Sequence, residues 1–206
     1  MARLTERRLI ERLRERFQTS ASAVTLGIGD DAAVLAAGGG QCVVSVDASV
    51  QGVHFDLRWL SLSDVGYRSF QAAVSDLAAM GARPLAAFSA LILPRELSPE
   101  QIDELTLGQR EASIETGCPI AGGNIARGGE LSVTTTVLGR CERPLLRSGA
   151  RPGEQLWLVG EIGLAAAGLA HLRCTGTAAR ATLPERLGLE GVVQAWRRPR
   201  ALIERG

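Results

Sequence analysis

Short apolar runs alternate along this chain with longer segments of helical spacing, and this alternation limits the possible folds more than any other feature. The apolar runs are Cys42–Val46, Leu85–Leu93 and Leu131–Leu138, and each is typical of a buried strand. Between them, segments 63–80 and 98–117 repeat apolar residues at helical spacing. None of the apolar runs is long enough to cross a bilayer. The pattern therefore predicts an α/β domain with no membrane partner.

Local signals set the expected ends of the helices. Ser63 is a plausible N-cap for the first of them, and Gly81 follows its last turn. Ser98 opens the second with a capping box and a proline at the first helical position, and Gly117 ends it. Residues 5–17 show the same spacing and predict a further helix at the N-terminus.

Residues 140–153 are rich in proline and glycine, which indicates a boundary between two domains. We expect residues 1–140 to form an N-terminal domain and residues 141–206 to begin a second one that is incomplete. The second part is predicted to hold a strand at Gln155–Val159, a helix at Gly163–Leu172 and then a polar tail.

Composition excludes several classes of chemistry. All 23 basic residues are arginine, so neither a Schiff base nor a P-loop lysine is possible. The net charge of +1 gives no reason to expect nucleic acid as a partner. Four scattered cysteines and two histidines argue against zinc and a disulfide framework. The N-terminus is charged throughout and does not resemble a secretory signal, so we expect a cytoplasmic protein.

Carboxylates stand in three places where a ligand could reach them. Asp30 and its neighbour Asp31 follow a glycine-rich stretch, and adjacent carboxylates repel each other unless a cation or hydrogen-bond donors lie nearby. Asp47 ends the first apolar run, where a strand enters a cleft. Asp76 lies among alanine, leucine and methionine, where a buried carboxylate needs a partner.

Each of these carboxylates also has a purely structural explanation. Asp30 fits a glycine–aspartate turn, and Asp47 could cap a turn. His54, which follows Asp47 closely, could be a partly buried histidine with a satisfied hydrogen bond. Arg68 or Arg83 could be the counter-ion of Asp76.

Two further segments suit the binding of phosphate. Gly122 and Gly123 precede Asn124, directly after a predicted short strand, and would allow close approach of a ligand. Arg147 opens the stretch Arg-Ser-Gly-Ala-Arg-Pro-Gly and could reach a phosphate. Both segments also fit plain turns.

The order of these motifs is more specific than any one of them. GIGDDAAV, D-x-x-x-x-G-V-H-F, SDLAAMGARP, a double glycine with a polar residue, and RSGARPG follow one another along the chain. This succession resembles the thiamine-monophosphate kinase family, which belongs with aminoimidazole ribonucleotide synthetase and selenophosphate synthetase to one wider group. The resemblance extends over essentially the whole chain. GVHF and RSGARPG point to the thiamine-phosphate kinases, whereas the other segments are shared across the group.

The resemblance implies a fold and an activity. The fold is an aminoimidazole ribonucleotide synthetase-like N-terminal domain of α/β (α+β) class with a mixed, mostly antiparallel sheet, followed by the beginning of a second α/β domain. The exposed face of the sheet is expected to form a homodimer. The activity is transfer of the γ-phosphoryl group of ATP to thiamine monophosphate with Mg²⁺, which requires positioning and charge neutralisation rather than a covalent nucleophile.

The resemblance also assigns ligands to individual residues. The metal ligands that it implies are Asp30, Ser45, Asp47, Asp76 and Asn124. It places Gly123, Asn124 and Arg147 against ATP and His54 against the thiamine substrate. Mg²⁺ prefers such oxygen ligands, and we expect Asp30, Asp47 and Asp76 to converge in one cluster of its size.

The chain departs from the family pattern in three ways. Val46 stands where a hydroxyl residue is usual, and Asn124 stands where the kinases have aspartate. The family's later Asp-Gly-rich and Gly-Glu-Asp segments would follow Gly206. Two alternatives to the kinase therefore stay open: a non-catalytic remnant that binds nucleotide or dimerises, and a relative with another substrate.

Overall fold

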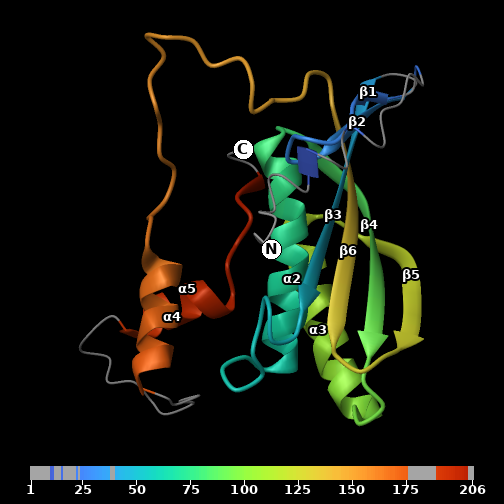
Figure 1. The fold of residues 1–206 in the computed structure, drawn as a ribbon, viewed down its shortest axis with the longest axis vertical. Helices are drawn as coiled ribbons and strands as arrows, with labels where there is room; N and C mark the ends of the chain where they lie inside the picture. The colour runs from blue at the N-terminus through green and yellow to red at the C-terminus, as the bar shows by residue number, and fades with distance from the viewer. Residues whose placement is uncertain are drawn as a thin grey trace, which may run out of the picture.

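A six-stranded mixed sheet forms the centre of the described chain (Figure 1). The computed structural model describes residues 24–37, 40–175 and 189–203, together with Ile10, Glu11, Glu15 and Ser22. The helix predicted over 5–17 thus lies almost entirely outside the described residues. The strands are β1 (Val24–Leu26), β2 (Ala33–Ala37), β3 (Gly40–Val50), β4 (Arg83–Leu93), β5 (Ile120–Arg127) and β6 (Ser132–Cys141).

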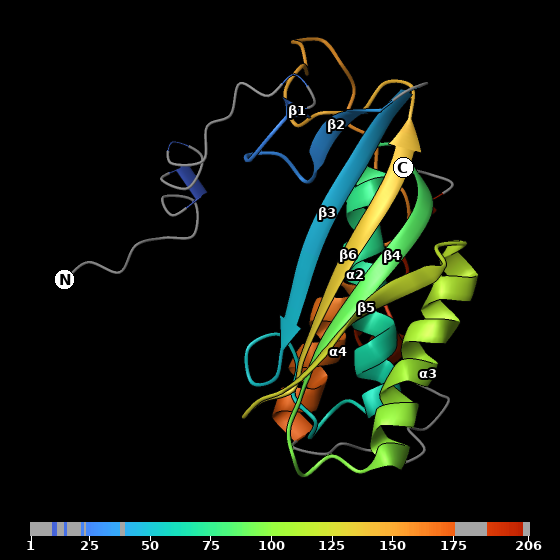
Figure 2. The same ribbon diagram turned by 90° about the vertical axis from the view of Figure 1, so that its right-hand side faces the viewer.

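The strand order is β1-β2-β3-β6-β4-β5. Every neighbouring pair is antiparallel except β4 and β5, which are parallel and joined through a helix. The predicted mixed, mostly antiparallel sheet is confirmed. Figures 1 and 2 show the helices gathered on one side of this sheet. Its other side, across β3, β6 and β4, carries no helix in the described part of the chain.

The described helices are α2 (Leu62–Ala79), α3 (Pro99–Thr116), α4 (Leu164–Thr175) and α5 (Leu189–Arg197). For α3 the predicted ends are confirmed: the Ser98 hydroxyl accepts from the Gln101 N–H at 3.3 Å, and Gly117 adopts φ 62°. For α2 the N-cap is Ser61 instead of Ser63. The reason is a reciprocal capping box, because the Ser61 hydroxyl accepts from the Asp64 N–H and the Asp64 carboxylate accepts from the Ser61 N–H. No helix in the described ranges combines the length and apolar character needed to span a membrane.

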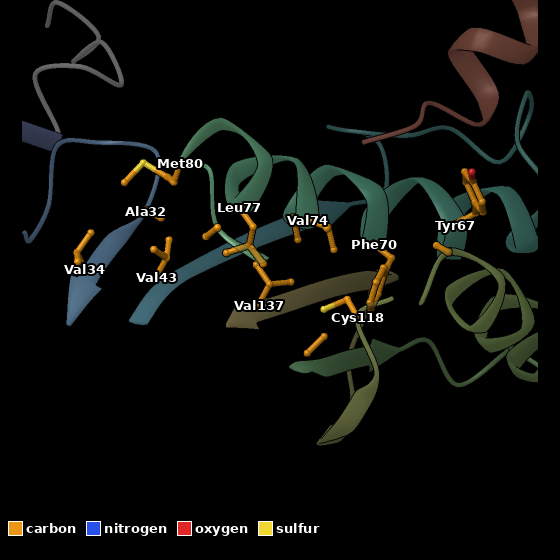
Figure 3. Packing of buried hydrophobic residues seen from close by; sticks show 14 residues of the cluster. Ala32, Val34, Val43, Tyr67, Phe70, Val74, Leu77, Met80, Cys118 and Val137 are labelled. Carbon is orange, nitrogen blue, oxygen red and sulfur yellow. The ribbon is translucent and has the colours of Figure 1, made fainter. Parts of the chain in front are cut away.

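The main core lies between α2 and the sheet (Figure 3). Phe70, Val74 and Leu77 recur at helical spacing on α2 and are fully buried. Val43 of β3 and Val137 of β6 meet them from the inner face of the sheet. This packing fixes α2, which carries Asp76, against β3, which carries Asp47.

Helices α2 and α3 touch at backbone distance, and glycine makes this possible. A Cβ atom built on Gly108 would stand 1.9 Å from the carbonyl oxygen of Ser63. One built on Gly66 would stand 2.0 Å from the carbonyl oxygen of Leu105. Real Cβ atoms do not approach other atoms so closely, so both positions require glycine.

Two strand predictions need correction. β3 continues to Val50, so Asp47 lies inside the strand and not at its end. β5 contains Gly122 and Asn124, which were expected to follow a strand. In both cases a neighbouring strand extends the pairing: β6 pairs with β3 through Val50, and β4 pairs with β5 through Arg127. Pairing across the sheet outweighs the local turn signal of glycine.

The second part of the chain also differs from prediction. The expected helix near Gly163–Leu172 is confirmed as α4. The strand expected at Gln155–Val159 is wrong, since this stretch has no secondary structure and Trp157 is 84% exposed. A strand needs a neighbour to accept its backbone hydrogen bonds, and the described sheet offers none here. The expected polar tail instead contains α5, whose Trp196 and Val193 join a second core cluster.

Candidate functional site

Ser45 and Asp76 form the centre of an acidic site between β3 and α2. The Ser45 hydroxyl donates a hydrogen bond of 2.5 Å to Oδ2 of Asp76. Ser45 is 6% exposed, and its hydroxyl oxygen also lies 3.4 Å from the carbonyl oxygen of Asp31. The loop after β1 therefore reaches the same place as the last turns of α2.

Arg147 joins this site from the segment that follows β6. Its guanidinium pairs with the carboxylate of Asp31 and lies 3.9 Å from Oδ1 of Asp30. The backbone N–H of Arg147 donates to Oδ2 of Asp30 at 3.2 Å. The Arg147 side chain is 62% exposed, so solvent screens these ion pairs and they contribute little to stability. The guanidinium is thus able to exchange a carboxylate for an anionic ligand.

Asp30, Asp31, Ser45 and Arg147 line an open cavity of about 300 Å³. Loop residues 27–33, residues 44–46 of β3 and Arg147 form most of its walls. This volume is at the lower end of the roughly 300–1,000 Å³ that is usual for small-molecule sites. The structure thus brings Asp30 and Arg147, two predicted binding residues from distant parts of the sequence, together with Asp31 at one cavity.

Two carboxylates near this cavity have perturbed acidity. Burial raises the pKa of Asp76, the Ser45 hydrogen bond opposes that rise, and the charges of Asp47 and Asp31 add to it. Burial likewise raises the pKa of Asp47, against a hydrogen bond from the Ala48 backbone and the charge of His54. A cation placed among these groups would relieve both the burial cost and the mutual repulsion.

The donor set fits a hard divalent cation. Its members are carboxylate, hydroxyl and carbonyl oxygens, which are the ligands that Mg²⁺ prefers. A further observation comes from Thr135, which lies opposite Asp47 in the β3–β6 register. Its Oγ1 is fully buried and has no hydrogen-bond partner among the described residues. Such an atom marks a place for an ordered water, including one bound to an ion.

The expected convergence of Asp30, Asp47 and Asp76 into one Mg²⁺-sized cluster is wrong for this structure. In the described ranges, no three acidic, histidine or cysteine side chains are close enough to hold a metal together. Two of these carboxylates instead have separate partners. Asp76 accepts from Ser45, whereas Asp30 accepts from Arg147. The role predicted for each residue as a ligand stays a prediction.

Gly123 and Asn124 lie on opposite faces of β5. Asn124 is in register with Ala90, and Gly123 is in register with Ser89. Because side chains alternate along a strand, Asn124 faces away from the helices, on the face opposite to Asp47. A Cβ atom on Gly123 would stand 1.8 Å from the carbonyl oxygen of Ser89. Contact between β4 and β5 is therefore enough to require glycine here, whatever its predicted role toward phosphate.

His54 belongs to a second cavity of about 150 Å³ below the acidic site. Its Nδ1 accepts a hydrogen bond of 3.1 Å from the backbone N–H of Val50. Asp47 also lines this cavity, so one strand contributes to both cavities through neighbouring residues. The structure thus places the predicted substrate residue beside a predicted metal ligand.

Arg68 also lines this cavity, a role that the sequence did not indicate. The sequence suggested Arg68 or Arg83 as the counter-ion of Asp76, but the charges that act on Asp76 are those of Asp47, Asp31 and Arg147. Arg68 instead lines the His54 cavity and contacts Trp196. That contact joins residues 128 positions apart, so no local sequence pattern predicts it.

Comparison with known proteins places the chain in a family. Residues 29–141, more than half of the chain, match the model described as AIR synthase related protein, N-terminal domain. Thiamine-monophosphate kinase of Mycobacterium tuberculosis is 39% identical over 178 residues, which are 85% of this chain and 53% of that protein. The chain thus spans about half the length of the curated relatives it matches.

Solved structures agree with this result. A structure described as AaThiL complexed with AMPPCP and TMP has a TM-score of 0.86 and 27% identity, over 99% of this chain and 63% of that one. Thiamine-monophosphate kinase from Stenotrophomonas maltophilia has a TM-score of 0.73 and 34% identity, over 96% and 62% of the two chains. The motifs, the sheet and these similarities together show that the chain belongs to the AIR synthase related protein family and to its thiamine-monophosphate kinase group.

Proposed function

We propose that this chain supplies the Mg²⁺- and ATP-binding part of a kinase that phosphorylates thiamine monophosphate to thiamine diphosphate. The observation that carries the proposal is the site where Ser45 and Asp76 meet the Asp30–Asp31 pair and Arg147 beside one open cavity. Acidic oxygens beside an exchangeable guanidinium suit a magnesium-bound polyphosphate. The solved relative described as complexed with AMPPCP and TMP supports the choice of substrates.

In this proposal Asp30, Ser45, Asp47 and Asp76 hold Mg²⁺, which when bound neutralises phosphate charge. Arg147 leaves the carboxylate of Asp31 and donates hydrogen bonds to the phosphates of ATP. Because the Arg147 side chain is exposed, this exchange costs little free energy. Because phosphoryl transfer depends on positioning and charge stabilisation, no nucleophilic side chain is required.

The remaining assignments complete the proposal. Gly123 and Asn124 of β5 are assigned to ATP, and His54 is assigned to the thiamine substrate. Residues 1–140 form the nucleotide-binding and dimerisation domain, and residues 141–206 begin a second domain. The protein acts in the cytoplasm on ATP and thiamine monophosphate.

The direct test is a binding matrix followed by an activity assay. The chain is titrated by calorimetry with ATP, AMPPCP, thiamine monophosphate and thiamine, each with and without Mg²⁺. We expect ATP and AMPPCP to bind only when Mg²⁺ is present. Product is then sought by chromatographic detection of thiamine diphosphate after incubation with ATP, Mg²⁺ and thiamine monophosphate.

Each outcome separates the hypotheses. Formation of thiamine diphosphate establishes the kinase. Nucleotide binding without product favours the non-catalytic remnant, and product from a different phosphate acceptor favours a relative with another substrate. Absence of any Mg²⁺-dependent nucleotide binding contradicts the proposal.

We also propose that the uncovered face of the sheet pairs with a second copy of the chain. Val46 and Phe88 lie in one row across this face, on either side of Thr136. They are 63% and 41% exposed, and Ile92 further along β4 is 43% exposed. A flat apolar face of this kind is typical of a protein interface.

A charge placed on that face tests the dimer. Phe88→Glu is expected to convert a dimer into a monomer, because an unpaired carboxylate cannot be buried in an apolar interface. Leu107→Glu on α3 is the matched control, since Leu107 is 47% exposed but lies on the helical side. Light scattering coupled to size-exclusion chromatography gives the mass. A monomeric native chain, or a dimeric Phe88→Glu variant, contradicts the proposal.

A further inference from the structure

The His54 cavity contains a cation that the proposed function has not used. Arg68 of α2 lines the cavity, together with Asp47 and Ser49 of β3 and His54 of the turn that follows. At about 150 Å³ the cavity has room for about five water molecules of roughly 30 Å³ each. It is therefore large enough for a phosphate group with part of its ester and too small for a nucleotide.

Arg68 is held in place without a carboxylate. Its guanidinium lies 5.2 Å from the ring centroid of Trp196 and donates a hydrogen bond to the Trp196 carbonyl oxygen. Among the described residues, no carboxylate forms an ion pair with it. Burial lowers the pKa of Arg68, with no acidic neighbour to offset the effect. A half-buried guanidinium with unused N–H groups is a ready site for an anion.

Further contacts fix the position of Trp196, which holds Arg68. The rings of Trp196 and Trp59 meet edge to face, with centroids 6.3 Å apart. Nε of Arg197 donates to the Trp59 carbonyl oxygen at 3.1 Å. Trp196 is only 6% exposed and belongs to the same core cluster as Val193. This bracing fixes the guanidinium before any ligand arrives, which reduces the entropy lost on binding.

His54 offers a second donor to the same cavity. Because Nδ1 accepts from the Val50 N–H, the ring proton of the neutral imidazole lies on Nε2. His54 and Arg68 thus both line the cavity, and between them they carry an imidazole N–H and a guanidinium, two groups that can donate to an anion. Asp47 is its acidic member and would repel an anion unless a cation neutralises it.

We propose that Arg68 binds the phosphate of the phosphorylated acceptor in this cavity, and that Trp196 of α5 fixes the guanidinium for that contact. The proposal rests on the proposed function for the identity of the acceptor, thiamine monophosphate. The geometry alone requires only a phosphate monoester or inorganic phosphate. Arg68 is then a specificity residue, because it distinguishes a phosphorylated acceptor from the free alcohol.

The test uses the whole chain in Mg²⁺ and compares Arg68→Gln with Arg58→Gln. Arg58 is a matched control: its guanidinium lies 5.1 Å from the ring centroid of Trp59, yet it pairs with Asp56 and does not line the cavity. Inorganic phosphate, thiamine monophosphate and thiamine are titrated by calorimetry. We expect Arg68→Gln to weaken phosphate and thiamine monophosphate binding by about tenfold or more, the typical loss of a charged hydrogen bond. Thiamine binding and the Arg58→Gln variant should be unchanged.

The outcomes separate this inference from the kinase. If the native chain binds thiamine monophosphate and Arg68→Gln binds it equally well, the Arg68 assignment is wrong while the kinase stands. If inorganic phosphate binds in an Arg68-dependent way but thiamine monophosphate binds no better, the assignment stands and the acceptor is wrong. If neither inorganic phosphate nor thiamine monophosphate binds at millimolar concentration, both the Arg68 assignment and the choice of acceptor are overturned.

A second pair of variants guards against loss of folding. Thermal melting and near-ultraviolet circular dichroism identify a misfolded Arg68→Gln. In that case Arg68→Lys, which keeps the charge but loses the forked geometry, should still weaken phosphate binding several-fold. Trp196→Phe should weaken it by a similar factor because the guanidinium loses part of its support. Unchanged phosphate affinity in both variants overturns the proposal.

Discussion

Gly108→Ala is expected to destabilise the protein by about 3 kcal/mol or more, which lowers its melting temperature by roughly 6–12 °C. The new methyl group would stand 1.9 Å from the carbonyl oxygen of Ser63 and 2.9 Å from the backbone nitrogen of Tyr67. Neither backbone atom is able to rotate away as a side chain would. The helices α2 and α3 would have to separate, and the core contacts of Leu105 would loosen. Thermal and urea unfolding monitored by circular dichroism measure the effect.

Gly191→Ala provides the matched control for this prediction. Gly191 also lies within a helix, α5, but a Cβ atom there would meet nothing within 4 Å. Alanine is the better helix former, so this variant should gain about 0.5–1 kcal/mol. The same substitution is thus expected to lower stability in α3 and to raise it in α5. A Gly108→Ala variant as stable as the native chain would show that α2 and α3 do not meet at backbone distance.

Asp76→Asn is expected to weaken Mg²⁺-dependent ATP binding by about 10–100-fold, a loss that even groups supporting a metal ligand typically cause. The amide keeps an oxygen that can accept from the Ser45 hydroxyl, which now donates at 2.5 Å. It also removes a carboxylate that is unfavourable in its charged form. Burial and the neighbouring carboxylates raise the pKa of that group. Folding stability should therefore hold or increase while nucleotide affinity falls. Calorimetric titration of ATP with Mg²⁺, beside a thermal melt, separates the two effects.

Asp103→Asn serves as the charge-matched control. Asp103 is exposed on α3, away from the acidic site, and its loss should leave both nucleotide affinity and melting temperature unchanged. An Asp76→Asn variant that binds ATP as tightly as the native chain would remove Asp76 from the predicted metal ligands. A variant that loses affinity and stability together would instead assign Asp76 a structural role.

Features that depend on neighbours in sequence could be predicted well. The limits of α3 follow from the capping box at Ser98 and the glycine at Gly117, and both act within one helical turn. β4 and β6 likewise follow from uninterrupted runs of apolar and β-branched residues. The sequence also marked Asp30, Asp76 and Arg147 as candidate binding residues: Asp30 follows glycines, Asp76 lies among apolar residues, and Arg147 opens a glycine-containing stretch. Their roles as ligands stay predictions.

Features that depend on distant partners could not be predicted. Asp47 was expected at a strand end because the apolar run stops there, but pairing with β6 carries β3 to Val50. α5 was missed because the contacts that stabilise it are distant in sequence. Its Trp196 packs against α2 and against Trp59, which lies in the turn before α2. Arg68 was assigned the wrong partner for the same reason. Each error concerns a contact whose two sides are separated by many residues.

The position of β6 between β3 and β4 sets the order in which the molecule can be made. Synthesis delivers β3 and β4 before β6, so until Cys141 has left the ribosome β3 can pair only with β2, and β4 can pair only with β5. Until then the nascent chain presents unpaired strand edges whose backbone groups could join those of other chains. Pairing of β3 with β6 also closes a long loop, which slows folding. Co-translational protection by chaperones should therefore matter most between the synthesis of β3 and that of β6.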